Sequence, residues 1–136
     1  MASNRASRVG FVGVGKIGRP MAEQLSRAGH DLMVFDVNPA ALAVFDGTLG
    51  DTGTTIAKSL AELVSECEIV CMCLPGPAEV EQLVLGENGI SSMIQPGTLL
   101  VDHTTNSPEL VRKIGEKLRE KGAAMIDAPI SGGVEG

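Results

Sequence analysis

A glycine-rich turn between two apolar segments constrains the fold of this chain more than any other feature. Residues 13–18 read Gly-Val-Gly-Lys-Ile-Gly and match the spacing G-x-G-x-x-G. The apolar residues 8–14 before the turn predict a buried strand. In residues 16–28 apolar side chains recur at helical spacing, which predicts a helix. A strand, a tight glycine turn and a helix in this order are typical of the start of a parallel α/β sheet.

The same alternation of apolar runs and helical periods continues along the chain. Further strands are predicted at residues 31–35, 68–74, 98–102 and 123–127. Further helices are predicted to begin at Pro39, after Ser59, at Pro77 and at Pro108, with Asn38, Ser59 and Ser107 as N-caps. Gly29 is predicted to end the helix of residues 16–28. The sequence therefore predicts the α/β class with a Rossmann-type, doubly wound parallel sheet. We expect a flexible N-terminus over residues 1–7 and one dinucleotide-binding domain over residues 8–136.

Size and charge exclude several other classes of protein. The chain has 136 residues, which is the size of one domain. It carries 11 Lys and Arg against 17 Asp and Glu, and its three aromatic residues are all Phe. An acidic chain with so few aromatic rings is not expected to bind nucleic acid or an anionic membrane. Its three cysteines lie close together and are odd in number, which is not the pattern of a disulfide framework. Free cysteines favour a reducing compartment.

An acidic residue follows the second predicted strand at the distance that nucleotide recognition requires. Asp36 lies 21 residues after Gly15, at the end of residues 31–35. A carboxylate there accepts hydrogen bonds from an adenosine ribose and repels a 2′-phosphate. No Lys or Arg occurs between Val37 and Asp51 to neutralise such a phosphate. The pattern predicts NAD as cofactor rather than NADP, the alternative being a glycine turn that binds no ligand.

Three more strand ends carry polar or rigid residues at the edge of the sheet where ligands bind. Residues 74–77 form a donor-poor loop that could cover a ring or a ribose, or simply lead into a helix. Residues 102–106 could offer hydroxyl and amide groups to a ligand at the same edge, or cap the next helix. Within this segment, we expect His103 to lie at the rim of the site and not to act as a catalytic base. Residues 127–133 could present Ser131 to a carboxylate, or lead to a further domain.

Four motifs in this order resemble the amino-terminal half of the β-hydroxyacid dehydrogenase family, of which 3-hydroxyisobutyrate dehydrogenase is the type member. They are residues 11–22, Cys73-Leu74-Pro75, residues 102–105 with Pro108, and residues 127–133. The resemblance runs from about Arg8 to Gly136. It implies an NAD-dependent oxidoreductase that oxidises the hydroxyl of a small β-hydroxyacid to a semialdehyde. A semialdehyde or glyoxylate reductase, a 6-phosphogluconate-like dehydrogenase and a non-catalytic NAD-binding regulator remain alternatives.

The resemblance also assigns site residues. Motif and resemblance together predict cofactor contacts at Gly13, Val14, Gly15, Lys16, Ile17, Gly18, Asp36, Val37, Asn38, Cys73, Leu74, Pro75 and Thr105. Substrate contacts are expected at Ser131, Gly132 and Gly133, and no metal ligand is expected. In this chain Thr104 stands where the family usually has Ser.

Two departures from the family limit what the resemblance implies. Some relatives have a cofactor-binding Asn close to the position of Glu79, so that contact is not transferred. The family's catalytic lysine and its helical second domain lie beyond Gly136, so no catalytic residue is assigned here. We therefore expect these residues alone to be inactive. We also expect the full-length protein to form a homo-oligomer. The expected location is the cytoplasm or, alternatively, the mitochondrial matrix.

Overall fold

A six-stranded parallel sheet forms the centre of the molecule. The computed structural model describes residues 8–45 and 54–130, so the expectation for residues 1–7 lies outside the described part. The strands are β1 (Arg8–Val12), β2 (Asp31–Phe35), β3 (Thr55–Ile56), β4 (Ile69–Met72), β5 (Leu99–Asp102) and β6 (Ala124–Asp127). Their order in the sheet is β3-β2-β1-β4-β5-β6, and all five pairings are parallel. The predicted doubly wound sheet is confirmed.

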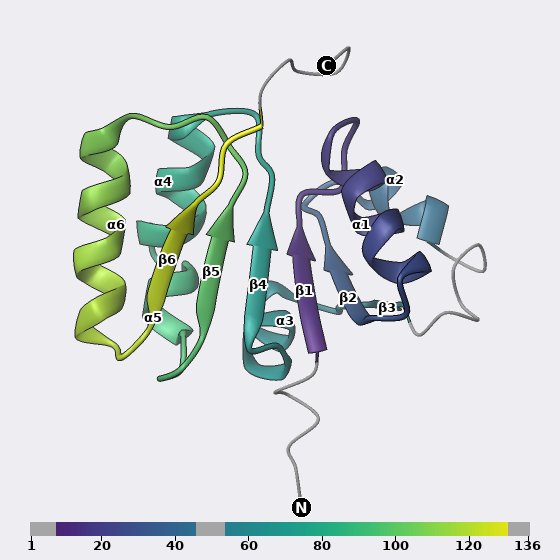
Figure 1. Cartoon of the computed structure of the whole chain (residues 1–136), viewed down its shortest axis with the longest axis horizontal. Coiled ribbons are helices and arrows are strands. Elements are labelled where there is room, and N and C mark those ends of the chain that lie inside the picture. The colour runs from purple at the N-terminus through teal and green to yellow at the C-terminus, as the bar shows by residue number, and fades with distance from the viewer. Residues whose placement is uncertain (1–7, 46–53, 131–136) are drawn as a thin grey trace, which may run out of the picture.

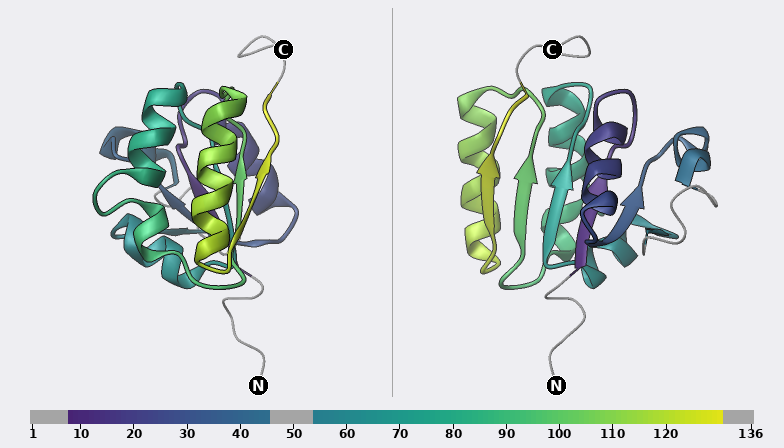
Figure 2. Two further views of the ribbon diagram at one scale, coloured as in Figure 1. Left: turned by 90° about the vertical axis from the view of Figure 1, so that its left-hand side faces the viewer. Right: turned by 45° about the vertical axis from the view of Figure 1, so that its right-hand side comes forward.

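Helices cover the sheet on both faces (Figures 1 and 2). They are α1 (Gly18–Arg27), α2 (Pro39–Leu42), the 3-10 helix η2 (Ala43–Phe45), α3 (Leu60–Glu66), α4 (Pro77–Leu85), α5 (Ile90–Met93) and α6 (Pro108–Glu120). One apolar core joins the sheet to α1 and η2, and includes Phe11, Ala22 and Phe45. The other joins it to α3, α4, α5 and α6, and includes Leu63 and Ile114.

Local sequence signals explain where most helices begin and end. Asn38, Ser59 and Ser107 each accept a backbone N–H through the side-chain oxygen and so cap α2, α3 and α6. Gly29 follows α1 with a φ of +92°, and the next amide, His30 N–H, donates to the Leu25 carbonyl. This left-handed position favours glycine and ends the helix as predicted.

The structure corrects several predicted boundaries. β1 ends at Val12 instead of residue 14, and α1 begins at Gly18 instead of residue 16, because the glycine turn occupies the residues between them. β4 covers Ile69–Met72, which is shorter than the predicted 68–74. The one-turn helix α5 (Ile90–Met93) was not predicted, since four residues are too few to show a helical period.

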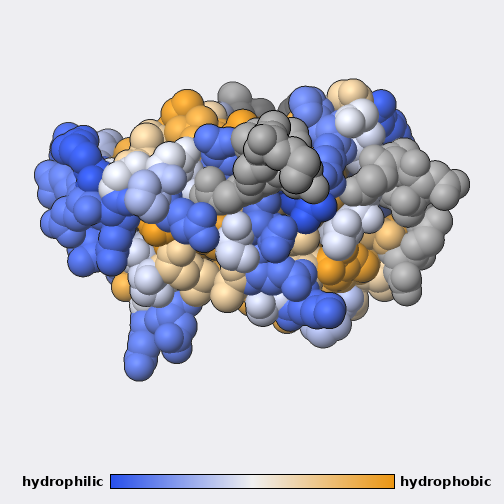
Figure 3. All heavy atoms as spheres, turned by 90° about the horizontal axis from the view of Figure 1, so that it is seen from below, coloured by the Kyte–Doolittle hydropathy of each residue, from blue (hydrophilic) through white to orange (hydrophobic). Residues whose placement is uncertain are grey.

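The strand order places a crevice at one end of the sheet. The chain leaves β1 towards β2 on one side, and β4 lies on the other side, so the loops after β1 and β4 diverge. Ligands of open parallel sheets bind at such a switch point, beyond the carboxyl ends of the strands. At the opposite end of the molecule, where the strands begin, hydrophilic residues are interspersed with separate hydrophobic areas (Figure 3). Within the described ranges, no helix has the length and apolar character needed to cross a membrane.

Candidate functional site

The glycine turn after β1 is tightly packed at two glycines and open at the third. A Cβ atom on Gly13, whose φ is +90°, would lie 2.1 Å from the Cys73 carbonyl oxygen. A Cβ atom on Gly18 would lie 1.9 Å from the Gly13 carbonyl oxygen. A Cβ atom on Gly15 would meet no atom within 4 Å. Gly13 and Gly18 therefore fix the shape of the turn, whereas Gly15 exposes backbone that another molecule can approach.

Asp36 is held against the same turn. Its Oδ2 atom accepts a hydrogen bond from the Val14 N–H at 2.9 Å, and its Oδ1 atom accepts one from the Asn38 N–H at 2.8 Å. These bonds fix the carboxylate at the end of β2 beside the glycine turn. The predicted proximity of Asp36 and the glycine turn is thus found in the fold, although Asp36 lies 21 positions after Gly15 in the sequence.

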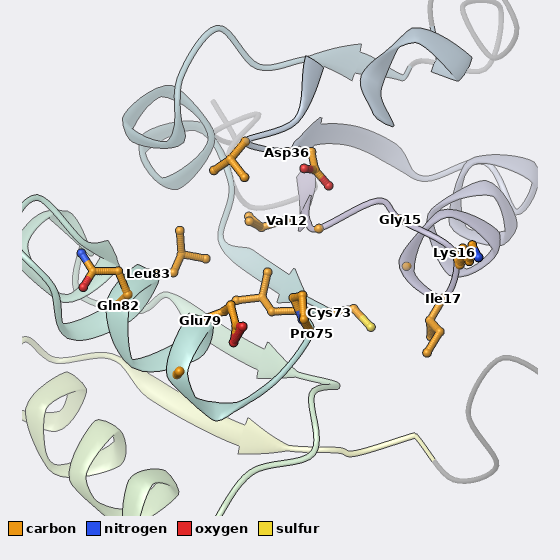
Figure 4. A pocket seen from close by; sticks show the side chains of 15 residues that line it. Val12, Gly15, Lys16, Ile17, Asp36, Cys73, Pro75, Glu79, Gln82 and Leu83 are labelled. Carbon is orange, nitrogen blue, oxygen red and sulfur yellow. The ribbon is translucent and has the colours of Figure 1, made fainter. Parts of the chain in front are cut away.

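A cavity of about 710 Å³ opens beside these groups. Ten of the predicted cofactor contacts line it: Gly13, Gly15, Lys16, Ile17, Gly18, Asp36, Val37, Cys73, Leu74 and Pro75. Figure 4 shows Asp36, Lys16 and Pro75 around one opening, although they come from three different loops. The volume is within the range of pockets that bind small molecules and cofactors.

The remaining predicted residues lie elsewhere or outside the described part. Val14 is buried and contributes its backbone N–H to Asp36. Asn38 caps α2. Thr105 is exposed after β5 and does not line the cavity formed by the described residues. The predicted substrate contacts Ser131, Gly132 and Gly133 lie outside the described residues.

Sequence reasoning missed one wall of this cavity. The additional lining residues are Val12, Ala78, Glu79, Gln82 and Leu83. Four of them, from Ala78 to Leu83, share one face of α4, and Figure 4 shows Gln82 and Leu83 together on that helix. The spacing of 78, 79, 82 and 83 was a signal for one helical face. The sequence could not show that this face turns towards the cavity.

The end of β5 is organised around a buried carboxylate. Asp102 is fully buried, and its Oδ1 atom accepts the Thr104 N–H at 2.9 Å. The Asn106 amide nitrogen donates to Asp102 Oδ2. Burial raises the pKa of Asp102, and the bonds from Thr104 and Asn106 oppose that rise. The predicted polar groups after β5 are therefore largely occupied with one another.

His103 lies on the neighbouring face of this segment. Its ring stacks on Phe11, with the ring centroids 6.3 Å apart, and its Nδ1 atom is 2.9 Å from the Ala128 carbonyl oxygen. Because a carbonyl only accepts, Nδ1 carries the proton in this contact. The imidazole thus connects β1 to the residues after β6.

The cysteines near the cavity are not activated as nucleophiles. Burial raises the pKa of the Cys71 thiol to about 11. Burial and the charge of Asp102 also raise the pKa of Cys73, which lines the cavity. Both thiols are therefore protonated near neutral pH. In the part of the chain that the structure describes, no group of His, Cys, Asp and Glu is arranged to hold a metal ion.

The cavity fits a dinucleotide in the features that can be tested on the protein itself. The N-cap of α1 is Ile17, and no side chain caps the helix. The Arg19 N–H donates to the Gly15 carbonyl and Pro20 has no N–H, so the amides offered to a phosphate are those of the residues before Arg19. Helix N-termini with free amides bind phosphate groups. The space above Gly15 is clear, and the Asp36 carboxylate lies beside the same turn, in the position expected of a ribose acceptor.

Comparison with known proteins agrees with this geometry. Residues 8–136 match the family described as the NAD binding domain of 6-phosphogluconate dehydrogenase. The chain belongs to this NAD-binding family. The described cavity is thus the candidate NAD site of a member of the family, and the resemblance to the β-hydroxyacid dehydrogenases is confirmed.

Individual relatives of this NAD-binding domain are dehydrogenases. A probable mitochondrial 3-hydroxyisobutyrate dehydrogenase of Dictyostelium discoideum is 35% identical over 100% of this chain and 41% of its own length. An NAD-dependent L-serine dehydrogenase of Pseudomonas aeruginosa is 40% identical over 95% of this chain and 42% of its own length. The solved 3-hydroxyisobutyrate dehydrogenase of Mycobacterium tuberculosis, studied with L-serine, has a TM-score of 0.79 and 29% identity, covering 96% of this chain and 42% of its own. The chain thus spans less than half the length of these relatives.

Proposed function

We propose that this chain is the cofactor-binding half of an NAD-dependent dehydrogenase that oxidises the hydroxyl group of a small β-hydroxyacid, such as 3-hydroxyisobutyrate, to a semialdehyde. The observation that carries the proposal is the position of Asp36, whose carboxylate is fixed beside the open glycine turn by the Val14 N–H. The names of the relatives support the substrate class, because 3-hydroxyisobutyrate and L-serine are both small acids with a hydroxyl group on the β-carbon.

Each part of the cavity has a distinct task in this proposal. The N-terminus of α1 and the backbone at Gly15 bind the pyrophosphate, and Asp36 accepts the hydroxyl groups of the adenosine ribose. Val37, which is 83% exposed, offers an apolar surface next to that ribose. Leu74 and Pro75 line the part of the cavity on the β4 side. A bound nicotinamide supplies the hydride acceptor for the oxidation.

The substrate side of the proposal rests on the resemblance. Ser131, Gly132 and Gly133 are proposed to bind the substrate, and Thr105 to contact the cofactor.

The full-length protein is proposed to be a homo-oligomer. A reducing compartment is proposed as its location, because the three cysteines of the described part are free.

Parallel titrations of the purified chain with NAD and NADP test the function directly. The chain contains no Trp or Tyr, so its own absorbance near 280 nm is slight and bound nucleotide is easy to observe. We expect saturable binding of NAD at one site per chain and binding of NADP at least about tenfold weaker. Equal affinity for the two nucleotides, or no binding of either, contradicts the proposal.

Removing the charge of Lys16 is expected to weaken NAD binding about three- to tenfold at low salt. Lys16 is exposed and lines the cavity beside the helix that would receive the pyrophosphate. The Lys16→Ala variant should also show a flatter dependence of affinity on salt concentration, because one screened charge contact is lost. Lys121→Ala, which changes the C-cap residue of α6, is the matched control and should bind like the wild type.

We expect the 136-residue chain to bind NAD and NADH without catalysing turnover. Oxidation of a hydroxyl group requires a base for its proton, and the resemblance assigns that role to a lysine outside these residues. The measurement is NADH formation from 3-hydroxyisobutyrate or L-serine at saturating NAD. Turnover by the chain on its own would show that one of its own residues supplies the base.

A further inference from the structure

We propose that Thr104 is a positioning residue, whose hydroxyl group fixes the Leu74-Pro75 wall of the cofactor cavity from behind. The proposal rests on the proposed function, because it concerns the half of the cavity that would hold the nicotinamide side of NAD. Thr104 is 3% exposed and does not itself line the cavity. It acts through Leu74 and is not expected to touch the cofactor.

The contact that carries the proposal joins the ends of two strands. The Leu74 N–H, after β4, donates to the Thr104 Oγ1 atom, after β5, at 2.9 Å. The neighbouring residue Pro75 has no N–H, and neither has Pro77. Residues 74–77 therefore have only two backbone donors, and the Leu74 N–H is the one that is tied to the next strand. Without it, the loop loses its anchor to β5.

A buried carboxylate fixes the direction of the Thr104 hydroxyl. Asp102 is fully buried and accepts hydrogen bonds from both the backbone N–H and the side chain of Thr104. A hydroxyl group has one proton and two acceptor lone pairs. A hydroxyl that donates its proton to the Asp102 carboxylate keeps a lone pair for the Leu74 N–H. Serine can make both bonds, and valine, which has the same shape as threonine, can make neither.

The wall that Thr104 supports lies against the glycine turn. A Cβ atom on Gly13 would be 3.1 Å from Leu74 Cδ2, so the Leu74 side chain already contacts this turn. Asp36 lies on the other side of the turn, after β2, whereas β4 pairs with the opposite edge of β1. A ligand that reaches only Asp36 and the turn should not depend on Leu74, but a ligand that extends across β4 should.

The test compares two ligands of different reach on matched variants of the full 136-residue chain. Dissociation constants for NADH and for ADP are measured by calorimetry on the wild type, Thr104→Val and Thr104→Ser. Thr98→Val is the control, because Thr98 is another buried threonine at the opposite end of β5. We expect Thr104→Val to weaken NADH binding about tenfold and ADP binding less than twofold, since the partly buried Leu74 N–H loses its acceptor. Thr104→Ser and Thr98→Val should stay within about twofold of the wild type for both ligands.

The outcomes separate this inference from the proposed function. Wild-type protein that binds neither NADH nor ADP overturns the proposed function. Wild-type protein that binds NADH while Thr104→Val binds it equally well overturns only the role of Thr104. Equal losses for NADH and ADP in Thr104→Val, or a loss in Thr104→Ser as large as in Thr104→Val, also overturn that role. Hydrogen exchange of the wild-type Leu74 amide, followed by NMR, provides a test that needs no folded variant: slow exchange supports the bond, and exchange as fast as in an exposed loop contradicts it.

Discussion

Replacing Gly15 by alanine should weaken NAD binding by about 100-fold or more and leave the free energy of unfolding within about 1 kcal/mol of the wild type. The added Cβ atom meets no protein atom within 4 Å, so the fold can accept it. It does, however, occupy the space in which a pyrophosphate would approach the backbone of the turn. Calorimetry with NAD and chemical unfolding, both on Gly15→Ala, measure the two quantities separately.

Gly18→Ala is the matched comparison in the same turn. Its Cβ atom would lie 1.9 Å from the Gly13 carbonyl oxygen, so the backbone has to move. We expect this variant to lose about 3 kcal/mol of stability, because the obstacle is backbone rather than a flexible side chain. If Gly15→Ala binds NAD like the wild type, the pyrophosphate does not bind at this turn. If Gly15→Ala is as unstable as Gly18→Ala, the turn is packed differently from the structure.

Replacing Asp36 by alanine should shift the ratio of NAD affinity to NADP affinity by about 100-fold towards NADP, which corresponds to about 2.7 kcal/mol. The magnitude follows from the interaction of two charges about 5 Å apart near a protein surface, which is worth about 3 kcal/mol at an effective dielectric constant of about 20. NAD binding itself should weaken, because the ribose loses its acceptor and the Val14 N–H loses the Asp36 carboxylate. Parallel titrations with the two nucleotides give the ratio.

Asp31→Ala is the control for this experiment. Asp31 is an acidic residue at the other end of the same strand, where it forms an ion pair with Arg8 at 3.1 Å. Its removal changes the net charge by the same amount but should leave the affinity ratio unchanged. A ratio that stays constant in Asp36→Ala, or that changes equally in Asp31→Ala, contradicts the role of Asp36 in selecting the nucleotide.

Short-range signals made the central part of the fold predictable. The glycine spacing, the apolar period of the strands and the helix caps all act within a few residues, so they can be recognised in the sequence. Asn38, Ser59 and Ser107 are examples, since each caps the helix that it was expected to cap. The predicted ends of β1 and β4 were less accurate, because apolar residues can continue beyond the point where backbone pairing between strands stops.

The candidate site was predictable only where it follows a known motif. Residues 13–18 and Asp36 were found because their spacing is set by the strand, the turn and the helix between them. The α4 wall with Glu79 and Gln82 was missed, because the same helical pattern is compatible with either solvent or a cavity. For the residues after β5 the sequence left ligand contacts and a helix cap as alternatives, and it did not indicate that the Thr104 hydroxyl accepts the Leu74 N–H.

The sequence by itself determined the class of fold, the glycine turn and the acid that follows it, since these depend on local backbone geometry and on the alternation of apolar residues. Only the tertiary structure decided that Asp36 bonds to the Val14 N–H, that Gly15 has free space above it, and that α4 closes the cavity. The physical reason is that these contacts join segments separated by 22 or more residues, such as Val14 and Asp36 or Leu74 and Thr104. Their distances are set by the packing of helices on a shared sheet, and no local pattern records them.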